Sequence, residues 1–488
     1  MTAPGIEVRG LSLHVGDRRL FDNLSFTVPD GQWVSLLGAS GAGKTSLLRV
    51  MAGLAPATRG EVVASDGQPI QGRLAWMGQK DLLYPWLSVR DNVALGARLR
   101  GEKVDRARVA ALLEQVELSS CADARPATLS GGMRQRAALA RTLYEDRPIV
   151  LMDEPFSALD TLTRTRIQTL AATLLAGRTV VLITHDPQEA CRLSHRLLVL
   201  SAADGDIDDS HHLAGTPPRA PDAPDLLIGQ ARPAAAADEG PTMTGRLWRG
   251  GMVFGGLMLL WGLVSRSGIP HFLLPSPLAV AEALWVNRAY LGWHTLITLS
   301  EILSGLALGV TLGVTLALGM ILSPRLQRWL MPLVLTSQAI PVFALAPLLV
   351  LWLGFGMSAK VAMAVLVIFF PVTSAFFDGL RRVNQEYLDL ARSMNASFGA
   401  QLRHVRLMAA LPALGSGLRM AAAVAPIGAI IGEWVGSAEG LGYVMLNANA
   451  RLQTDICFAA LFILVLLTLL LWLAVDTLLH RLIDWSPE

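Results

Sequence analysis

The sequence predicts an α/β domain built on a parallel sheet, followed by an all-α membrane domain of six helices. The first observation is charge density: residues 1–240 carry 54 charged side chains, whereas residues 241–488 carry 26. The second is that short apolar runs alternate with amphipathic stretches in the first part. The third is that the second part contains six apolar stretches of near-bilayer length. These features exclude a disordered chain, a collagen-like fibre and a purely soluble enzyme.

The overall charge and the cysteines limit the partners that we expect. The formal net charge is +2 and no basic block rises above the background, which argues against a nucleic-acid partner. Cys121, Cys191 and Cys457 are far apart without metal-ligand spacing, so we expect buried thiols in a reducing compartment. The N-terminal residues show no secretory signal, and membrane insertion is therefore expected from the later apolar segments.

In the first part, three apolar runs predict the central strands of the sheet: Trp33–Leu37, Ile149–Met152 and Val180–Thr184. Continuous apolar runs of this length suit parallel strands that helices cover on both faces. From Ser201 to Gly245 the composition changes to Asp, Pro, Ala and Gly, which predicts a peripheral tail running into a linker.

A glycine-rich run directly follows the first of these strands and precedes an apolar helix. It reads GASGAGKT and fits a phosphate-binding loop, in which glycines let backbone N–H groups wrap phosphates at a helix N-terminus. Lys44 is expected to reach the β- and γ-phosphates, and the Thr45 hydroxyl to bind Mg²⁺. The residues expected to contact the nucleotide are Gly38, Ala39, Ser40, Gly41, Ala42, Gly43, Lys44, Thr45 and Ser46. Alone, the run indicates a nucleotide hydrolase or a structural glycine turn.

Two carboxylates end the apolar run IVLMDE. We expect Asp153 to hold Mg²⁺, directly or through water, and Glu154 to polarise the water that attacks the nucleotide. Adjacent carboxylates are unusual at the end of a buried strand, so the pair strengthens the interpretation of the glycine-rich run.

A second glycine-containing run, LSGGMRQR, lies between these two motifs. Ser130, Gly131 and Gly132 open an arginine-bearing helix, which suits a second phosphate-binding N-terminus. Lys44 and Ser130 lie far enough apart for an inserted helical subdomain. Two half-sites in one domain indicate that a partner copy closes each nucleotide site, so we expect a homodimer.

Together these motifs resemble the ATPase domain of ABC transporters, and LSGGMRQR is similar to the signature of that family. The resemblance implies ATP and Mg²⁺ as ligands, and it extends to Gln79 in the Q-loop, Asp160 at the end of SALD, and the switch His185. It implies that Gln79 and His185 act in catalysis with Glu154, that Gln79 also reaches the metal, and that Asp160 belongs to the nucleotide site. The sequence departs from the family where an aromatic residue usually stacks on adenine. Val15 stands at that place, with His14 and Phe21 as possible substitutes.

We expect three regions: an ATP-binding domain over residues 1–229, a linker over 230–245 and a permease domain over 246–488. The expected spans are 249–266, 294–321, 329–353, 359–377, 416–436 and 456–479. Basic residues concentrate in the loops on one side, which predicts an even number of spans with the ATPase domain and both termini in the cytoplasm. Gly305, Gly309 and Gly313 form a close-packing face on the second span. Prolines predict that the third span is kinked or broken.

The loop after the fourth span contains DLARSMNAS and then Leu-Pro, and it resembles the coupling motif of ABC importer permeases. The resemblance assigns the coupling contact to Asp389, Ala391, Asn395 and Pro412. Asn395 stands where that motif has glycine, and we expect it to preserve the turn because asparagine tolerates a left-handed backbone. The alternative is that the arginines of this loop reflect only the positive-inside rule.

Within the importers, the runs PWLSVRDNV and GEWVGSAEGLGY resemble the nitrate, sulfonate and taurine group, and longer stretches of both halves resemble thiamine-precursor (hydroxymethylpyrimidine) importers. The resemblance implies a bacterial cytoplasmic (inner) membrane protein that contacts lipid and receives its solute from a periplasmic or extracellular solute-binding protein. An exporter and a membrane ATPase that acts as a sensor are the alternatives.

Glu433 and Trp434, near the outer end of the fifth span, are the candidates for the solute path. An intramembrane carboxylate usually faces a cavity or a partner, and tryptophan can stack on a flat ring. The alternative is an interfacial tryptophan beside a structural, hydrogen-bonded glutamate.

Overall fold

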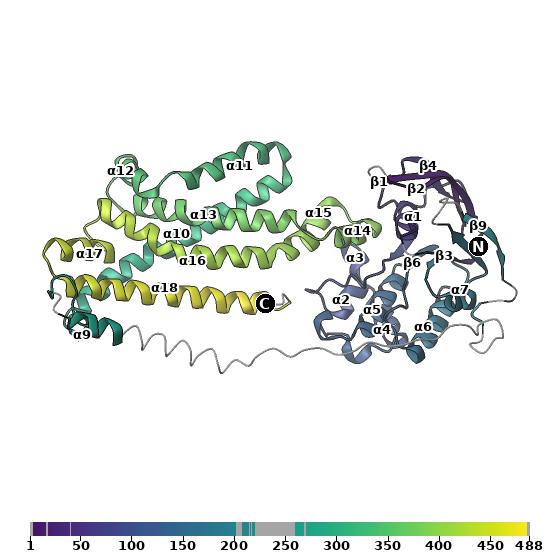
Figure 1. Ribbon diagram of the computed structural model, residues 1–488, viewed down its shortest axis with the longest axis horizontal. Coiled ribbons are helices and arrows are strands. Elements are labelled where there is room, and N and C mark those ends of the chain that lie inside the picture. Colours follow the sequence, from purple (N-terminus) through teal and green to yellow (C-terminus); the bar gives the residue numbers. More distant parts are fainter. Residues whose placement is uncertain are drawn as a thin grey trace. The chain divides into compact units, whose positions relative to one another are not determined.

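The computed structural model describes residues 3–15, 18–39, 41–201, 207–213, 215, 217–219, 259–267 and 270–485. Figure 1 shows the elements coloured along the chain. The chain divides into two compact units: Met1–Arg232 with Val383–Met408 and Trp485–Glu488, and Pro233–Arg382 with Ala409–Asp484. The expected linker 230–245 lies outside the described residues. So does most of the first expected span, of which residues 259–265 are helical.

The first unit is built on two sheets. The smaller one is antiparallel in the order β2-β1-β4 and consists of β1 (Ile6–Val15), β2 (Arg18–Val28) and β4 (Arg59–Ala64). The larger one has the order β5-β6-β7-β3-β8-β9. Its strands are β3 (Trp33–Gly38), β5 (Leu74–Met77), β6 (Ile149–Asp153), β7 (Thr179–Ile183), β8 (Arg196–Leu200) and β9 (Ile207–His212). The three expected central strands are confirmed: they are parallel, and β6 and β7 are buried throughout.

β9 differs from the expectation of a peripheral tail after Ser201. It pairs antiparallel with β8 at the edge of the larger sheet. An edge strand needs only backbone hydrogen bonds on one side, so its polar sequence IDDSHH carries no apolar alternation that reveals it.

Helices cover the larger sheet and fill the insertion between β5 and β6. α1 (Lys44–Met51) follows β3, and α6 (Thr161–Leu174) and α7 (Pro187–Leu193) flank β7. The inserted subdomain, expected from the spacing of the two glycine motifs, contains α2 (Val89–Val93), α3 (Leu95–Arg100), α4 (Arg106–Gln115) and α5 (Gly131–Tyr144). The unit also includes α14 (Gln385–Ser393) and α15 (Phe398–Gln401), which follow far later in the chain.

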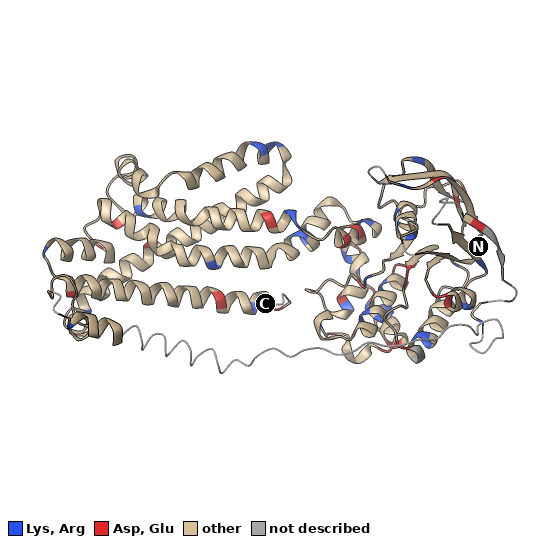
Figure 2. Ribbon diagram, in the orientation of Figure 1, with Lys and Arg blue, Asp and Glu red and all other residues tan. Residues whose placement is uncertain are grey.

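The second unit is helical, and charged side chains are sparse along its helices (Figure 2). Its elements are α9 (Pro277–Val286), α10 (Arg288–Leu322), α11 (Pro324–Ala339), α12 (Val342–Leu353), α13 (Met357–Arg381), α16 (Leu407–Gly436), α17 (Leu441–Ala450) and α18 (Thr454–Leu482). Among the described residues, four helical segments are long and apolar enough to cross a membrane, or five if α11 and α12 form one span. α11 and α12 are bent by 105° at Ile340 and Pro341, which confirms the expected break in that span.

The glycine face of α10 lets this helix approach α13 closely. A Cβ atom at Gly309 would lie 2.7 Å from Ile368 Cγ2, and one at Gly313 would lie 2.9 Å from the Phe369 carbonyl oxygen. The expected close-packing face is therefore present, and these positions have no room for a larger residue.

We predict that Gly309→Leu destabilises the second unit by about 1–3 kcal/mol, because the added side chain overlaps Ile368. Gly292→Leu on the same helix is the matched control, since a Cβ atom there meets nothing within 4 Å. Thermal unfolding of the detergent-purified chain measures the difference, and equal melting temperatures for the two variants would contradict the prediction.

Candidate functional site

The glycine-rich run connects the end of β3 to the start of α1. Gly41 and Gly43 adopt left-handed conformations, with φ of 82° and 96°, and Gly43 is the N-cap of α1. The Lys44 ammonium folds back over the loop and donates hydrogen bonds to the carbonyl oxygens of Gly38 (2.7 Å) and Ala39 (3.0 Å). The first N–H groups of α1 therefore point out of the helix beside a lysine. Ser40 lies outside the described residues.

The two carboxylates at the end of β6 have different surroundings. Asp153 is buried and its carboxylate is hydrogen-bonded to the Thr45 hydroxyl, and burial raises the pKa of Asp153 above its usual value. Glu154 follows in a left-handed conformation, with φ of 47°, and its backbone N–H donates to the Ile183 carbonyl oxygen of β7. Gln79 Nε2 donates to Glu154 Oε2 over 3.3 Å, and His185 Nδ1 lies 3.3 Å from Glu154 Oε1. The structure thus gathers Gln79, His185 and Glu154 at one point.

A cavity of 310 Å³ opens between the loop and these carboxylates. Gly41, Gly43, Lys44, Thr45 and Ser46 line one side of it. Gln79, Asp153 and Glu154 line the other side. A Cβ atom at Gly41 would meet nothing within 4 Å, so the loop leaves open space beside its backbone. Lysine, backbone N–H donors and hard oxygen ligands fit a nucleoside triphosphate with its divalent cation.

Four of the expected nucleotide contacts outside the phosphate loop do not line this cavity: Ser130, Gly131, Gly132 and Asp160. Ser130 is the N-cap of α5 and accepts a hydrogen bond from the Met133 backbone N–H, and Gly131 begins that helix. Asp160 is the N-cap of α6 and accepts from the Thr163 N–H. Within one chain, the signature run and Asp160 therefore lie outside the cavity that the phosphate loop lines.

Two buried side chains that sequence reasoning missed connect these parts. Gln135, on α5, donates to the Glu154 carbonyl oxygen and accepts from the Ala158 N–H, so it ties the signature helix to the carboxylate loop. Arg141 is fully buried and donates to the carbonyl oxygens of Asp81 and Leu82, just after Gln79. Burial lowers the pKa of Arg141 to about 10, so it remains protonated at neutral pH. Both lie within or after LSGGMRQR, which is the only sequence signal for them.

For the adenine contact, the side chain of Val15 lies outside the described part of the structure. Phe21 is buried against Gly43, and so offers no open ring face, whereas His14 is exposed.

The first unit also contains the segment expected to couple ATP hydrolysis to transport. The Asp389 side chain is completely buried, and its carboxylate accepts from Arg49 Nη2 (2.5 Å), Arg392 Nη1 (3.0 Å) and Gln385 Nε2 (3.0 Å). Arg49 lies in the last turn of α1, the helix that begins at Lys44. The pair therefore connects the phosphate-loop helix to a segment 340 positions later in the chain.

Other contacts seat α14 beside the segment that follows Gln79. Tyr84, Trp86 and Tyr387 form an aromatic cluster, with ring centroids 5.0 to 6.1 Å apart, and the Tyr84 hydroxyl donates to the Tyr387 carbonyl oxygen. Lys80 pairs with Glu386 at the exposed edge of this contact.

The remaining expected coupling residues occupy two different units. Ala391 is buried in α14. Asn395 follows α14 with φ of 59°, so the left-handed turn expected of it is present. Pro412 is a residue of α16 in the second unit.

Comparison with known proteins agrees with this arrangement. A model of the ABC transporter family matches residues 21–157, and a model of the binding-protein-dependent transport system inner membrane component matches residues 309–484. A probable ABC transporter permease protein of Haemophilus influenzae is 52% identical over 242 residues, which cover 49% of this chain and 98% of that protein. The chain belongs to the ABC transporter family.

Two further relatives of the transporter match its ATPase half. An uncharacterized ABC transporter ATP-binding protein of H. influenzae is 46% identical over 199 residues, covering 40% of this chain and 81% of that protein. The aliphatic sulfonates import ATP-binding protein SsuB 1 of Paracoccus denitrificans is 43% identical over 226 residues, covering 46% of this chain and 90% of that protein. The transporter is thus an importer-type fusion of an ATPase with an inner-membrane permease, and it couples ATP hydrolysis to transport.

In the membrane unit of the transporter, the side chains of Glu433 and Trp434 lie in different surroundings. Glu433 is buried, and its carboxylate accepts from the Thr298 hydroxyl (2.6 Å) and from the Gly442 backbone N–H. Trp434 is half exposed and lines a cavity of 730 Å³. The geometry of Glu433 favours the structural alternative, because its contacts join α10 and α17.

We predict that Arg49→Ala weakens the packing of α14 against the rest of the first unit by about 3 kcal/mol. The reason is that the variant removes the arginine that pairs with the buried Asp389 carboxylate from outside α14. Trypsin cleavage at Arg392 and Arg403 of the full chain should accelerate and so measures this loss.

Lys80→Ala is the matched control, since its exposed pair with Glu386 contributes less than about 1 kcal/mol. The double variant Arg49→Leu with Asp389→Leu should restore part of the protection. Equal cleavage rates in the Arg49 and Lys80 variants would show that the buried pair does not hold this segment.

Proposed function

We propose that the chain is one half of an importer that uses ATP to move a small polar solute inward across the bacterial cytoplasmic membrane. The ion pair between Arg49 and the buried Asp389 carries this proposal. It links the helix of the nucleotide site to a segment from the permease half of the sequence. A sensor without transport would not need that link, and the match to an importer-type permease disfavours an exporter.

We assign residues 1–229 to the ATPase domain, 230–245 to the linker and 246–488 to the permease. Both termini and the ATPase domain lie in the cytoplasm in this proposal. The concentration of arginines in the loops of that side supports the orientation.

The residues of the nucleotide site take the following roles. The backbone N–H groups of Gly38 to Ser46 and the Lys44 ammonium hold the phosphates of ATP. Thr45, Asp153 and Gln79 would hold Mg²⁺, which when bound neutralises charge on the β- and γ-phosphates. Asp160 lies at the N-terminus of α6, where it supports the partner's half of the site.

Glu154 accepts the proton of the attacking water. The water oxygen bonds to the γ-phosphorus while the bond from that phosphorus to the β-bridging oxygen breaks, which yields ADP and phosphate. Gln79 and His185 contact the two oxygens of Glu154 and so orient its carboxylate. His185 is two-thirds exposed, so it can respond to the nucleotide without unfolding the loop around it.

A complete site requires a second copy of the chain. Ser130, Gly131 and Gly132 do not line the nucleotide cavity of their own chain, and Ser130 and Gly131 form the N-terminus of α5. In a homodimer, each copy closes the ATP of the other with this N-terminus. Closure moves α1, and the Arg49–Asp389 pair transmits the movement to the permease segment.

A solute-binding protein outside the membrane delivers the solute in this proposal, as the family name of the permease half supports. We favour a thiamine-precursor pyrimidine as the solute, with a sulfonate as the second candidate. Relatives named for aliphatic sulfonate import match through the ATPase half, and the nucleotide site of that half does not contact the solute. In this proposal, the side chains of the permease half contact the solute and so determine which of the two candidates is transported.

We predict that Glu154→Gln binds ATP normally and loses about 10²–10⁴-fold in ATPase activity, because the amide cannot accept the proton of the attacking water. With ATP and Mg²⁺ the variant should accumulate as a dimer in size-exclusion chromatography. Glu114→Gln, an exposed carboxylate on α4, is the control and should retain activity. ATPase activity near that of the unaltered chain in Glu154→Gln would overturn the catalytic assignment.

A further variant tests the shared site. A Cβ atom at Gly131 meets nothing within 4 Å, so Gly131→Arg fits the single chain but would occupy the place of the partner's phosphate. Combined with Glu154→Gln, it should abolish the ATP-dependent dimer while ATP still binds. Ala110→Arg, at an exposed position of α4, is the control. A dimer that persists in the Gly131 variant would exclude this mode of closure.

A further inference from the structure

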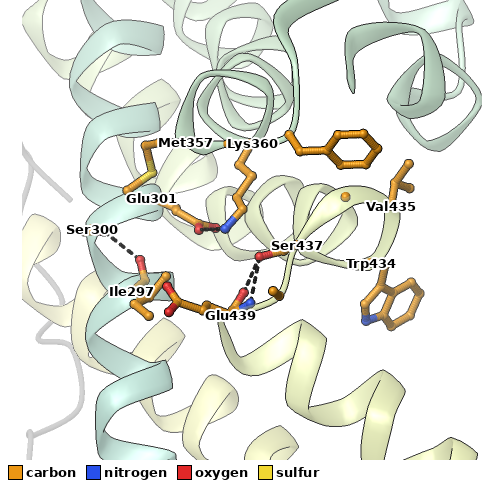
Figure 3. A pocket seen from close by; sticks show the side chains of 13 residues that line it. Ile297, Ser300, Glu301, Met357, Lys360, Trp434, Val435, Ser437 and Glu439 are labelled. Atoms are coloured by element: carbon orange, nitrogen blue, oxygen red, sulfur yellow. Dashed lines mark hydrogen bonds and ion pairs between the residues drawn. The ribbon is translucent and has the colours of Figure 1, made fainter. Parts of the chain in front are cut away.

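A cavity of 730 Å³ lies in the membrane unit, between the start of α13 and the parts of α10 and α16 that face it (Figure 3). Its volume is within the range of pockets that hold small organic molecules. Glu301 and Ser300 of α10, Lys360 of α13, Trp434 of α16 and the following Ser437 and Glu439 contribute to its lining. Polar and aromatic side chains therefore line a space inside an otherwise apolar unit.

The positive charge of the cavity is already compensated. Lys360 Nζ donates to Glu301 Oε1 over 2.7 Å, and this ion pair is almost completely shielded from solvent. Among the described residues that line the cavity, Lys360 is the single basic one. An anionic solute would have to displace Glu301 from its partner, and this would leave a carboxylate buried without compensation.

The remaining charge of the lining is negative. The buried Glu433 carboxylate accepts from Thr298 and Gly442 and is not one of the residues that line the cavity. Glu439 is exposed at the cavity, and its backbone N–H and carbonyl oxygen both bond to the Ser437 hydroxyl, which fixes the turn that carries it. The lining thus contains two carboxylates and one ammonium group, and because Lys360 is paired with Glu301, the charge of Glu439 is uncompensated and favours a cation or a donor of N–H hydrogen bonds.

The rim of the cavity supplies aromatic surface. Trp434 is half exposed, and Phe355 is exposed on the segment before α13. In Figure 3 the indole of Trp434 projects from the side of α16 and is not enclosed by other labelled side chains. An exposed indole binds flat rings by stacking and cations through its face.

We propose that this cavity binds the transported solute, and that it selects a flat nitrogen heterocycle, neutral or cationic, with N–H donors, and rejects organic sulfonates. The proposal rests on the importer function proposed above. It names the side chains that choose between the two candidate solutes. Trp434 stacks on the ring, the carboxylate of Glu439 attracts its N–H groups, and the closed Lys360–Glu301 pair offers no free cation to a sulfonate.

Isothermal titration calorimetry tests this directly with the full chain in lipid nanodiscs, without nucleotide. The two probes are 4-amino-5-hydroxymethyl-2-methylpyrimidine and ethanesulfonate. We expect saturable binding of the pyrimidine, and binding of ethanesulfonate that is about tenfold weaker or more. Trp434→Ala should weaken pyrimidine binding about tenfold, whereas Trp434→Phe should retain most of it. Trp329→Ala, an exposed tryptophan of α11 outside the cavity, is the matched control.

Glu439→Lys reverses the charge at the cavity and should exchange the preference, so that ethanesulfonate binds and the pyrimidine binds less tightly. Three results would each overturn the proposal: no saturable binding of the pyrimidine, equal or tighter binding of ethanesulfonate by the unaltered chain, or pyrimidine binding that neither Trp434→Ala nor Glu439→Lys changes. None of these results affects the ATPase test on Glu154, so failure of the solute site and failure of the importer function are distinguishable.

Discussion

Asp389 has no exposed side-chain surface, so the groups that compensate its negative charge determine where α14 lies. Arg392 and Gln385 belong to the same helix, and Arg49 provides the compensation from another element. Arg49 and Lys44 are five residues apart on α1, or about 7.5 Å along the helix axis. One rigid element therefore carries the lysine of the phosphate loop at its start and the partner of Asp389 near its end. A shift of α1 at the nucleotide must therefore either move α14 with it or separate Arg49 from Asp389, which would leave a buried carboxylate without its partner.

In the membrane unit, small residues determine where charged side chains meet. A Cβ atom at Gly432 would lie 2.9 Å from Lys360 Cα, and one at Gly428 would lie 2.7 Å from Ala364 Cα, so α16 approaches the backbone of α13 at the level of the lysine. On the other side, the glycines of α10 give the same helix a second close neighbour. This double approach brings Glu301, Lys360 and Glu433 together from three helices. The ion pair is thus a consequence of backbone packing, and the cavity beside it begins where the close packing ends.

The features that the sequence predicted correctly depend on local patterns. The phosphate loop needs glycines at positive φ, and Gly41 and Gly43 have it. The prolines of the third expected span predicted a break, which separates α11 from α12. Arg49, Gln135 and Arg141 escaped prediction because their contacts join residues that lie far apart in the chain, and a local motif does not identify such partners. β9 escaped for the opposite reason, since an edge strand is stabilised by backbone hydrogen bonds that any polar sequence can make.

Glu433 and Trp434 show why adjacent residues in a motif need not share a role. Consecutive residues of an α-helix point about 100° apart, so a helix at the boundary of a cavity directs one side chain inward and the next toward the open space. The Glu433 carboxylate meets donors from Thr298 and Gly442, and these fix the start of α17 against α10. His294 accepts from the Gly440 N–H and reinforces the same turn. The hydrogen bonds of Glu433 therefore fix the turn between α16 and α17. This turn positions Ser437 and Glu439 at the cavity that Trp434 also lines.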